Sequence, residues 1–189
     1  LGSSQMLAFS TAQIRALTLA QVSSVETSDM EVLTTVQIQA FSSLQVAAWV
    51  PEQVTALSTA QVAALGTNQV VALTTSQLVL LESTDLQALT TTQIAALRPS
   101  QVSALSLEEV PLLLTTQVAA LTTAQIRGLG VEQISVLTTA QVAALNTAQL
   151  VVLTATQVAA LETDGIQGLS TVQMPALTTV QIQALQPEQ

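Results

Sequence analysis

The chain has 189 residues, of which 49% are hydrophobic and only 8% are charged, with three basic residues, twelve acidic residues and a formal net charge of −9. This balance argues against binding to nucleic acid or to anionic membrane surfaces, because both need basic patches. Cysteine, histidine and tyrosine are absent, which excludes a disulfide framework and removes the usual thiol nucleophile and the commonest general base.

From its first residue the chain repeats every eight residues, without insertion or deletion. Leucine opens most octads, a glutamine follows four residues later, and the next residue is Val, Ile, Leu or Met. The glutamine is replaced in only four octads, by Asp29, Asp85, Glu109 and Gly165. We therefore predict a single continuous array over residues 1–189, with about 24 octads.

One octad contains all the signals that start a helix. In Leu137–Ala144, Thr138 lies three residues before Gln141, the spacing of a capping box, in which each side chain pairs with the other residue's backbone N–H. Leu137 before the cap and Val142 at the fourth helical position form a hydrophobic staple. The octad therefore predicts a helix of about six residues, held in place chiefly by burial of Val and Leu against neighbouring helices.

Proline supports this assignment, because Pro51, Pro99 and Pro187 all fall on the first helical position, where the missing N–H costs least. A single long helix would need 4.0 residues per turn, which matches no known helical repeat. A β-solenoid would need alternating apolar and polar residues, which the octad lacks. The predicted fold class is thus all-α, a solenoid of very short helices.

The number of helices per coil is predicted from one column. Its glutamines, Gln39, Gln87, Gln167 and Gln183, are separated by multiples of sixteen residues. The alternate octads hold Arg15, Arg127, Pro111, Pro175, Ala47, Ala63, Ala95, Ala143 and Ala159. This pattern favours two helices, or 16 residues, per coil.

Acidic residues gather at the start of three octads, at Glu26 to Asp29, Glu82 to Asp85 and Glu162 to Asp164. A Ca²⁺ site would need more oxygen ligands than two carboxylates provide, so the favoured interpretation is stabilisation by the positive end of a helix dipole. The adjacent pair Glu108 and Glu109 lacks partners for acid–base chemistry. We predict no catalytic, cofactor-binding or metal-binding residues, no cofactor, and no enzymatic activity.

Other columns have a structural interpretation and a functional alternative. The glutamines could form a ligand-binding ladder, and the Thr pairs a flat hydroxyl array that orders ice, but capping explains both. Phe9, Phe41 and Trp49 are expected in the core, with an aromatic docking patch as the alternative. Pro111 and Pro175 fall inside predicted helices, where proline breaks the hydrogen bonding, so we expect distorted coils there.

No apolar run is long enough to span a bilayer, and no signal peptide is visible at the N-terminus. Both the first and the last octad keep the consensus, although solenoids usually end in polar capping repeats. We therefore expect either a segment of a longer array or ends that stack on one another in a fibre.

The octad Leu-[Thr/Ser]-[Thr/Pro]-x-Gln-[Val/Ile]-x-Ala resembles repeats in very large bacterial secreted or surface proteins, often labelled adhesins. The resemblance covers the whole chain and implies an extracellular or cell-surface location and a rigid stalk or spacer role. The expected partners are copies of the chain, associated end to end or laterally, or other surface and matrix components. A self-assembling extracellular filament and a ligand- or ice-binding solenoid are the alternatives.

If burial supplies most of the stability and the cap supplies less, alanine substitutions in the two columns should differ in their cost. Replacing Gln141 by alanine should cost about 0.5–2 kcal/mol, the value of a helix cap. Replacing Leu137 by alanine should cost about 2–5 kcal/mol, because it opens a cavity in the core.

Overall fold

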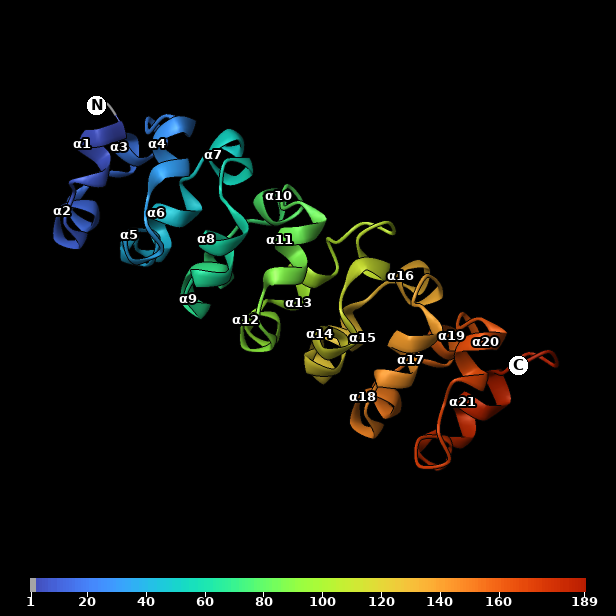
Figure 1. Cartoon of the computed structure of the whole chain (residues 1–189). Helices are drawn as coiled ribbons and strands as arrows, with labels where there is room; N and C mark the ends of the chain where they lie inside the picture. The colour runs from blue at the N-terminus through green and yellow to red at the C-terminus, as the bar shows by residue number, and fades with distance from the viewer. Residues whose placement is uncertain (1–2) are drawn as a thin grey trace. The chain divides into compact units, whose positions relative to one another are not determined.

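A computed structural model describes residues 3–189, and within that range the chain is all-helical, with 21 α-helices, two short 3₁₀ helices and no strand (Figure 1). This confirms the all-α solenoid of very short helices. The chain divides into two compact units, the first ending at Leu97 and the second beginning at Arg98.

In the first unit the helices are α1 (Ser3–Leu7), α2 (Thr11–Ala16), α3 (Leu19–Ser23), α4 (Thr27–Val32), α5 (Thr35–Ala40), α6 (Ser43–Ala47), α7 (Pro51–Thr55), α8 (Thr59–Ala64), α9 (Thr67–Ala72), α10 (Thr75–Leu78), α11 (Ser83–Ala88) and α12 (Thr91–Ala96). In the second unit they are α13 (Pro99–Val102), η1 (Val110–Leu112), α14 (Thr115–Ala120), α15 (Thr123–Gly128), α16 (Val131–Ser135), α17 (Thr139–Ala144), α18 (Thr147–Val152), α19 (Ala155–Ala159), α20 (Thr163–Gln167), η2 (Met174–Ala176) and α21 (Thr179–Ala184).

Most of the helices begin where the capping box places them. In α17 the Thr138 hydroxyl accepts from the backbone N–H of Gln141 at 3.2 Å, and the Gln141 Oε1 accepts from the backbone N–H of Thr138 at 2.9 Å. Leu137 and Val142, the two residues of the predicted staple, are both buried. Two of the three proline signals are confirmed, because α7 and α13 begin at Pro51 and Pro99. The third is wrong, because Pro187 begins a turn and no helix.

Two extended residues form the corner after a six-residue helix. Leu33 ends α4 with φ −59° and ψ 135°, and Thr34 precedes α5 with φ −69° and ψ 157°. Between α17 and α18 the angles are similar, with φ −63° and ψ 132° at Leu145 and φ −81° and ψ 166° at Asn146. No residue from 3 to 189 has a positive φ, so every corner can be built from ordinary L-residues and the corners need no glycine.

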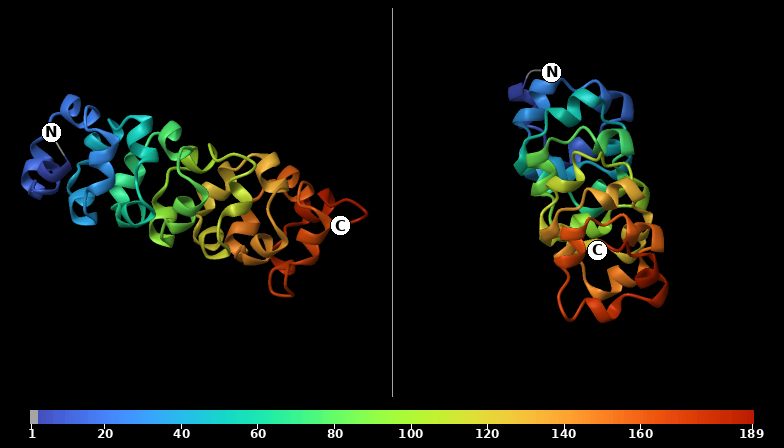
Figure 2. Two further views of the ribbon diagram at one scale, coloured as in Figure 1. Left: turned by 45° about the horizontal axis from the view of Figure 1, so that its top comes forward. Right: turned by 90° about the vertical axis from the view of Figure 1, so that its right-hand side faces the viewer.

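Three helices make one coil. In the first unit α5 packs on α2 and on α8, and α6 packs on α3 and on α9, so each helix contacts those three octads away. In the second unit α17 packs in the same way on α14 and on α20. The coil therefore holds 24 residues, and the prediction of two helices in 16 residues is wrong. Figure 2 shows neighbouring coils within each unit stacked beside one another.

The error has a physical cause. The glutamines that suggested a 16-residue period, Gln39, Gln87, Gln167 and Gln183, are all exposed to solvent. Core packing places little constraint on exposed side chains, so their spacing is a poor guide to the number of helices in a coil, although the Gln39 Nε2 does donate to the Ala64 carbonyl, 25 residues later, at 2.9 Å.

The core comes from two columns of the octad. The residue after the glutamine is almost completely buried, as at Ile38, Val62 and Val142, and the leucine that opens each octad is nearly so. Phe41 and Trp49 occupy the leucine column and are 2% and 3% exposed, with their rings 5.4 Å apart in an edge-to-face contact. These two aromatic residues therefore lie in the core, as expected, whereas Phe9 is half-buried.

The two internal prolines distort their octads, as predicted. Pro111 and Pro175 lie in the 3₁₀ helices η1 and η2, which replace the regular α-helix of the octad. A proline at this position has no N–H to donate to the carbonyl four residues earlier, so the α-helix cannot form through it. None of the helices between residues 3 and 189 is long and apolar enough to cross a bilayer.

Candidate functional site

The glutamine side chain joins two coils. In the second unit the Gln141 Nε2 donates to the carbonyl oxygens of Val110, at 2.9 Å, and Leu113, at 2.7 Å. These acceptors lie 31 and 28 residues earlier in the sequence, at the corner of the preceding coil. Since Oε1 of the same side chain accepts from the N–H of Thr138, one amide links the start of its own helix to the corner beneath.

The same arrangement recurs in the first unit. The Gln61 Oε1 accepts from the backbone N–H of Ser58 at 2.7 Å, while its Nε2 donates to the carbonyls of Met30 and Leu33 at 2.8 and 2.7 Å. We call this arrangement of one glutamine between two coils a glutamine clamp. Clamps that reach both carbonyls are formed by Gln37, Gln45, Gln53, Gln61, Gln69, Gln77, Gln93, Gln133, Gln141, Gln149 and Gln181.

The clamp solves a problem that very short helices create. The first N–H groups and the last C=O groups of a helix have no partner within that helix, and a six-residue helix consists largely of such ends. The clamp supplies an acceptor to one helix start and donors to one helix end. Gln141 is only 1% exposed, so both of its polar atoms are paired where water cannot replace the protein partner.

The glutamine is the constant half of the capping box. Where the cap residue is Val50, Arg98, Gly66 or Gly130, no side chain accepts at the helix start, yet the glutamine still accepts from the backbone N–H of that residue. The cap hydroxyl can therefore be lost while the glutamine is kept.

Sequence reasoning identified only half of the glutamine's role. The capping box was confirmed, but the bond to the preceding coil was missed. A signal for it does exist, because a capping box accepts Glu as well as Gln and the helix dipole favours Glu, yet Glu occurs in this column once, at Glu109. A carboxylate keeps the acceptor, as the 2.6 Å bond from the N–H of Ser106 to Glu109 shows, but it has no N–H to donate.

The three octads whose helices begin with acidic residues do not form the clamp. Glu26, Glu82 and Glu162 occupy the cap position without making a side-chain cap bond. Asp85 is buried in place of a glutamine and accepts at 2.7 Å from the hydroxyl of Thr59 in α8. Asp29 is buried too, and its Oδ1 has no hydrogen-bond partner within residues 3–189.

No group of three or more acidic residues between residues 3 and 189 is arranged to hold a metal ion. The acidic residues still sit in the first turn of α4, α11 and α20, where the helix dipole favours them.

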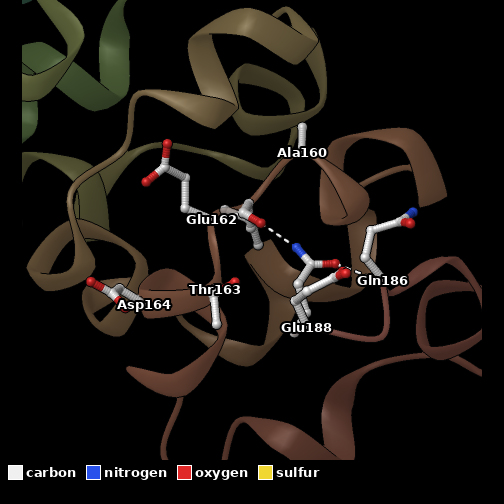
Figure 3. Close-up of a pocket in the computed structure, with 8 residues that line it drawn as sticks. Ala160, Glu162, Thr163, Asp164, Gln186 and Glu188 are labelled. Carbon is white, nitrogen blue, oxygen red and sulfur yellow. Dashed lines mark hydrogen bonds between the residues drawn. The ribbon is translucent and has the colours of Figure 1, made fainter.

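Surface notches occur where the corners of successive coils meet. One of them, about 500 Å³, is lined by Glu162, Thr163 and Asp164 at the start of α20 and by Gln186 and Glu188 near the C-terminus (Figure 3). Dashed lines in Figure 3 mark the bonds of Gln189, which accepts from the N–H of Gln186 at 2.8 Å and donates to the Leu161 carbonyl. The notch is thus the outer surface of a clamped corner.

The cap hydroxyls are occupied by the fold. Thr34, Thr74, Thr90, Thr122 and Thr138 each accept from the backbone N–H of the glutamine three residues later, at 3.1–3.2 Å. This supports the capping interpretation of the first threonine column.

The repeated leucine, cap threonine and clamp glutamine occur together in residues Ala120–Gln125, which read Ala-Leu-Thr-Thr-Ala-Gln. The sequence family described as the ALTTAQ repeat matches the chain at residues 22–59, 51–82, 78–113, 110–147 and 140–171. The chain belongs to the ALTTAQ repeat family. In this ALTTAQ array the leucine is a core residue, the first threonine caps the helix and the glutamine forms the clamp. A comparison with curated proteins gave no match.

Proposed function

We propose that this ALTTAQ array is a non-catalytic spacer, the stiff stalk region of a bacterial secreted or surface protein. The observation that carries the proposal is the glutamine clamp, which ties the corner of one coil to the corner of the next at several successive corners of each unit. A solenoid whose coils are joined in this way resists separation of its layers, which is the property that a stalk needs.

The clamps act in addition to the core. Each clamp contributes two hydrogen bonds between coils, and a net hydrogen bond is worth about 1 kcal/mol. In a solenoid each coil contacts only its neighbours, so the stability of the array depends on these interface terms. Clamps at successive corners therefore oppose bending in more than one direction, and loss of one clamp leaves the others in place.

Stiffness can be measured within the first unit. The chain has no cysteine, so the double variant Thr11→Cys and Ser83→Cys places two spin labels on equivalent positions of α2 and α11. The contacts α2 with α5, α5 with α8 and α8 with α11 put three coil steps between them, or about 24–30 Å at 8–10 Å per step. Electron-paramagnetic-resonance distance measurement should give a narrow distribution in this range.

A broad distribution would contradict the spacer proposal, because a flexible chain cannot hold two sites apart. Electron microscopy of the same preparation checks the filament alternative, which predicts fibres that appear with increasing concentration. The ice-binding alternative predicts shaped ice crystals and depressed freezing, whereas the spacer proposal predicts neither.

The cellular part of the proposal is tested separately. Its support is the similarity of the octad to repeats of large bacterial secreted proteins. Antibodies raised against the folded chain should label intact cells of the producing bacterium or its culture medium. Labelling only after the cells are lysed would refute the surface location. The partners proposed with it are other surface or matrix components and further copies of the chain.

A further inference from the structure

One octad of the second unit lacks both of the devices that hold its neighbours. At residues 161–168 the clamp position is Gly165, which has no side chain, so the amide donor that Gln141 provides in α17 is missing. The carbonyls 28 and 31 residues earlier belong to Leu137 and Ile134, the corner that this clamp would reach. The cap residue Glu162 makes no side-chain cap bond either.

The helix of this octad is also weak on its own. Gly165 lies within α20, which has only five residues, and a glycine in a helix interior costs about 1 kcal/mol relative to alanine. The next glycine, Gly168, lies so close to α17 that a Cβ there would be 2.9 Å from the Thr139 side chain. A second notch of about 280 Å³ lies between them, lined by Thr139, Asp164, Gln167 and Gly168.

Toward the preceding coil α20 has no clamp, so apolar packing holds it against α17. Ile166 and Leu169 remain buried, as in other octads, and α20 packs on α17 as a regular third neighbour. We propose that α20 is a yield point of the second unit, the octad that opens first in native-state fluctuations and under tension. The order of opening follows from these bonds alone, while its use under tension rests on the proposed spacer function.

Hydrogen exchange on the intact chain, followed by mass spectrometry, tests the order of opening. The missing cap and the two missing bonds predict that amides of α20 exchange on the order of 100-fold faster than those of α17, after correction for intrinsic rates. They should also exchange faster than those of α21, which lies nearer the C-terminus but has the clamp of Gln181. Faster exchange in α21 than in α20 would mean end fraying and would overturn the proposal.

Two variants test whether the missing clamp amide and the missing cap hydroxyl cause the faster exchange in α20. Gly165→Gln restores the clamp and should slow exchange in α20 at least tenfold, and a Cβ at this position would meet only the Val142 side chain, at 3.4 Å. Glu162→Thr restores the cap alone, without adding bulk against α17, and should slow exchange several-fold. Unchanged exchange in both variants would overturn the proposal. Because these measurements need no cell, they stand or fall separately from the surface location and the stalk role.

Discussion

Changing Gln141 to Glu separates the two roles of the glutamine with almost no change in shape. The introduced carboxylate keeps an acceptor for the N–H of Thr138 but loses the donor to Val110 and Leu113, whose carbonyl oxygens lie 2.9 and 2.7 Å from Nε2. If the glutamine were only part of a capping box, this change would be neutral or slightly stabilising, because Glu serves equally well in a box and suits the helix dipole.

The clamp predicts a large loss instead. Two hydrogen bonds worth about 1 kcal/mol each disappear, and a buried charge is placed against two carbonyl oxygens, so we expect the free energy of unfolding to fall by about 3–5 kcal/mol. Urea unfolding at pH 7, followed by circular dichroism, measures this change. The control is Gln183→Glu, an exposed glutamine outside the clamp column, which should change stability by less than about 0.5 kcal/mol.

The way in which the stability loss of Gln141→Glu changes with pH distinguishes the clamp from a capping role. Burial against two carbonyls raises the pKa of the introduced carboxyl above its usual value of about 4.3. Below that value the carboxyl is protonated in both states and can donate again, so the deficit should be small. It should grow as the pH rises through the unfolded and then the folded pKa. Stability equal to that of the unmodified chain at pH 7 would refute the clamp.

Three further predictions use other parts of the array. Pro111→Ala restores an N–H and should convert η1 into α-helix, raising the free energy of unfolding by about 1–2 kcal/mol. Pro99→Ala, at a first helical position, should leave the free energy of unfolding nearly unchanged. Urea unfolding and backbone chemical shifts measure both variants. Removing the whole octad 57–64 should leave a cooperatively folded chain, but removing only its first four residues should not, as calorimetry would show. Replacing Glu82 by Thr together with Asp85 by Gln should add about 1–3 kcal/mol of stability and slow exchange in α11; no change would count against the cap and clamp there.

The sequence predicted the local structure well because the relevant signals are local. Thr138 and Gln141 lie within one turn of each other, so their pairing needs no knowledge of the fold. The link from Gln141 to Val110 spans 31 residues and depends on how many helices close a coil, which an exposed column such as that of Gln39 could not report. The expected order of the alanine variants changes for this reason. Gln141→Ala loses the clamp as well as the cap and should cost about 2–4 kcal/mol, comparable to Leu137→Ala.

The candidate site shows the same limit. The cap column and the core aromatics were predictable, because their roles follow from spacing and from hydrophobicity. The missing clamp at the corner of Leu137, which results from Gly165, was not predictable, because only the number of helices in a coil shows that these two residues lie together. The acidic octads were correctly separated from the rest, but their missing cap bonds became visible only in the structure.

The three-helix coil has a consequence for how such genes can change length. The octads have one length and no corner between residues 3 and 189 needs a positive φ, so we expect duplication or loss of a single octad to be absorbed without a misfit. The coil, however, has three sides. Gain or loss of one octad rotates the following residues by a third of a turn about the axis of the solenoid, so a surface feature such as the acidic start of α20 moves to another side. Gain or loss of three octads leaves that feature on the same side. Length and the direction in which a feature points can therefore evolve together in steps of one octad, or independently in steps of three.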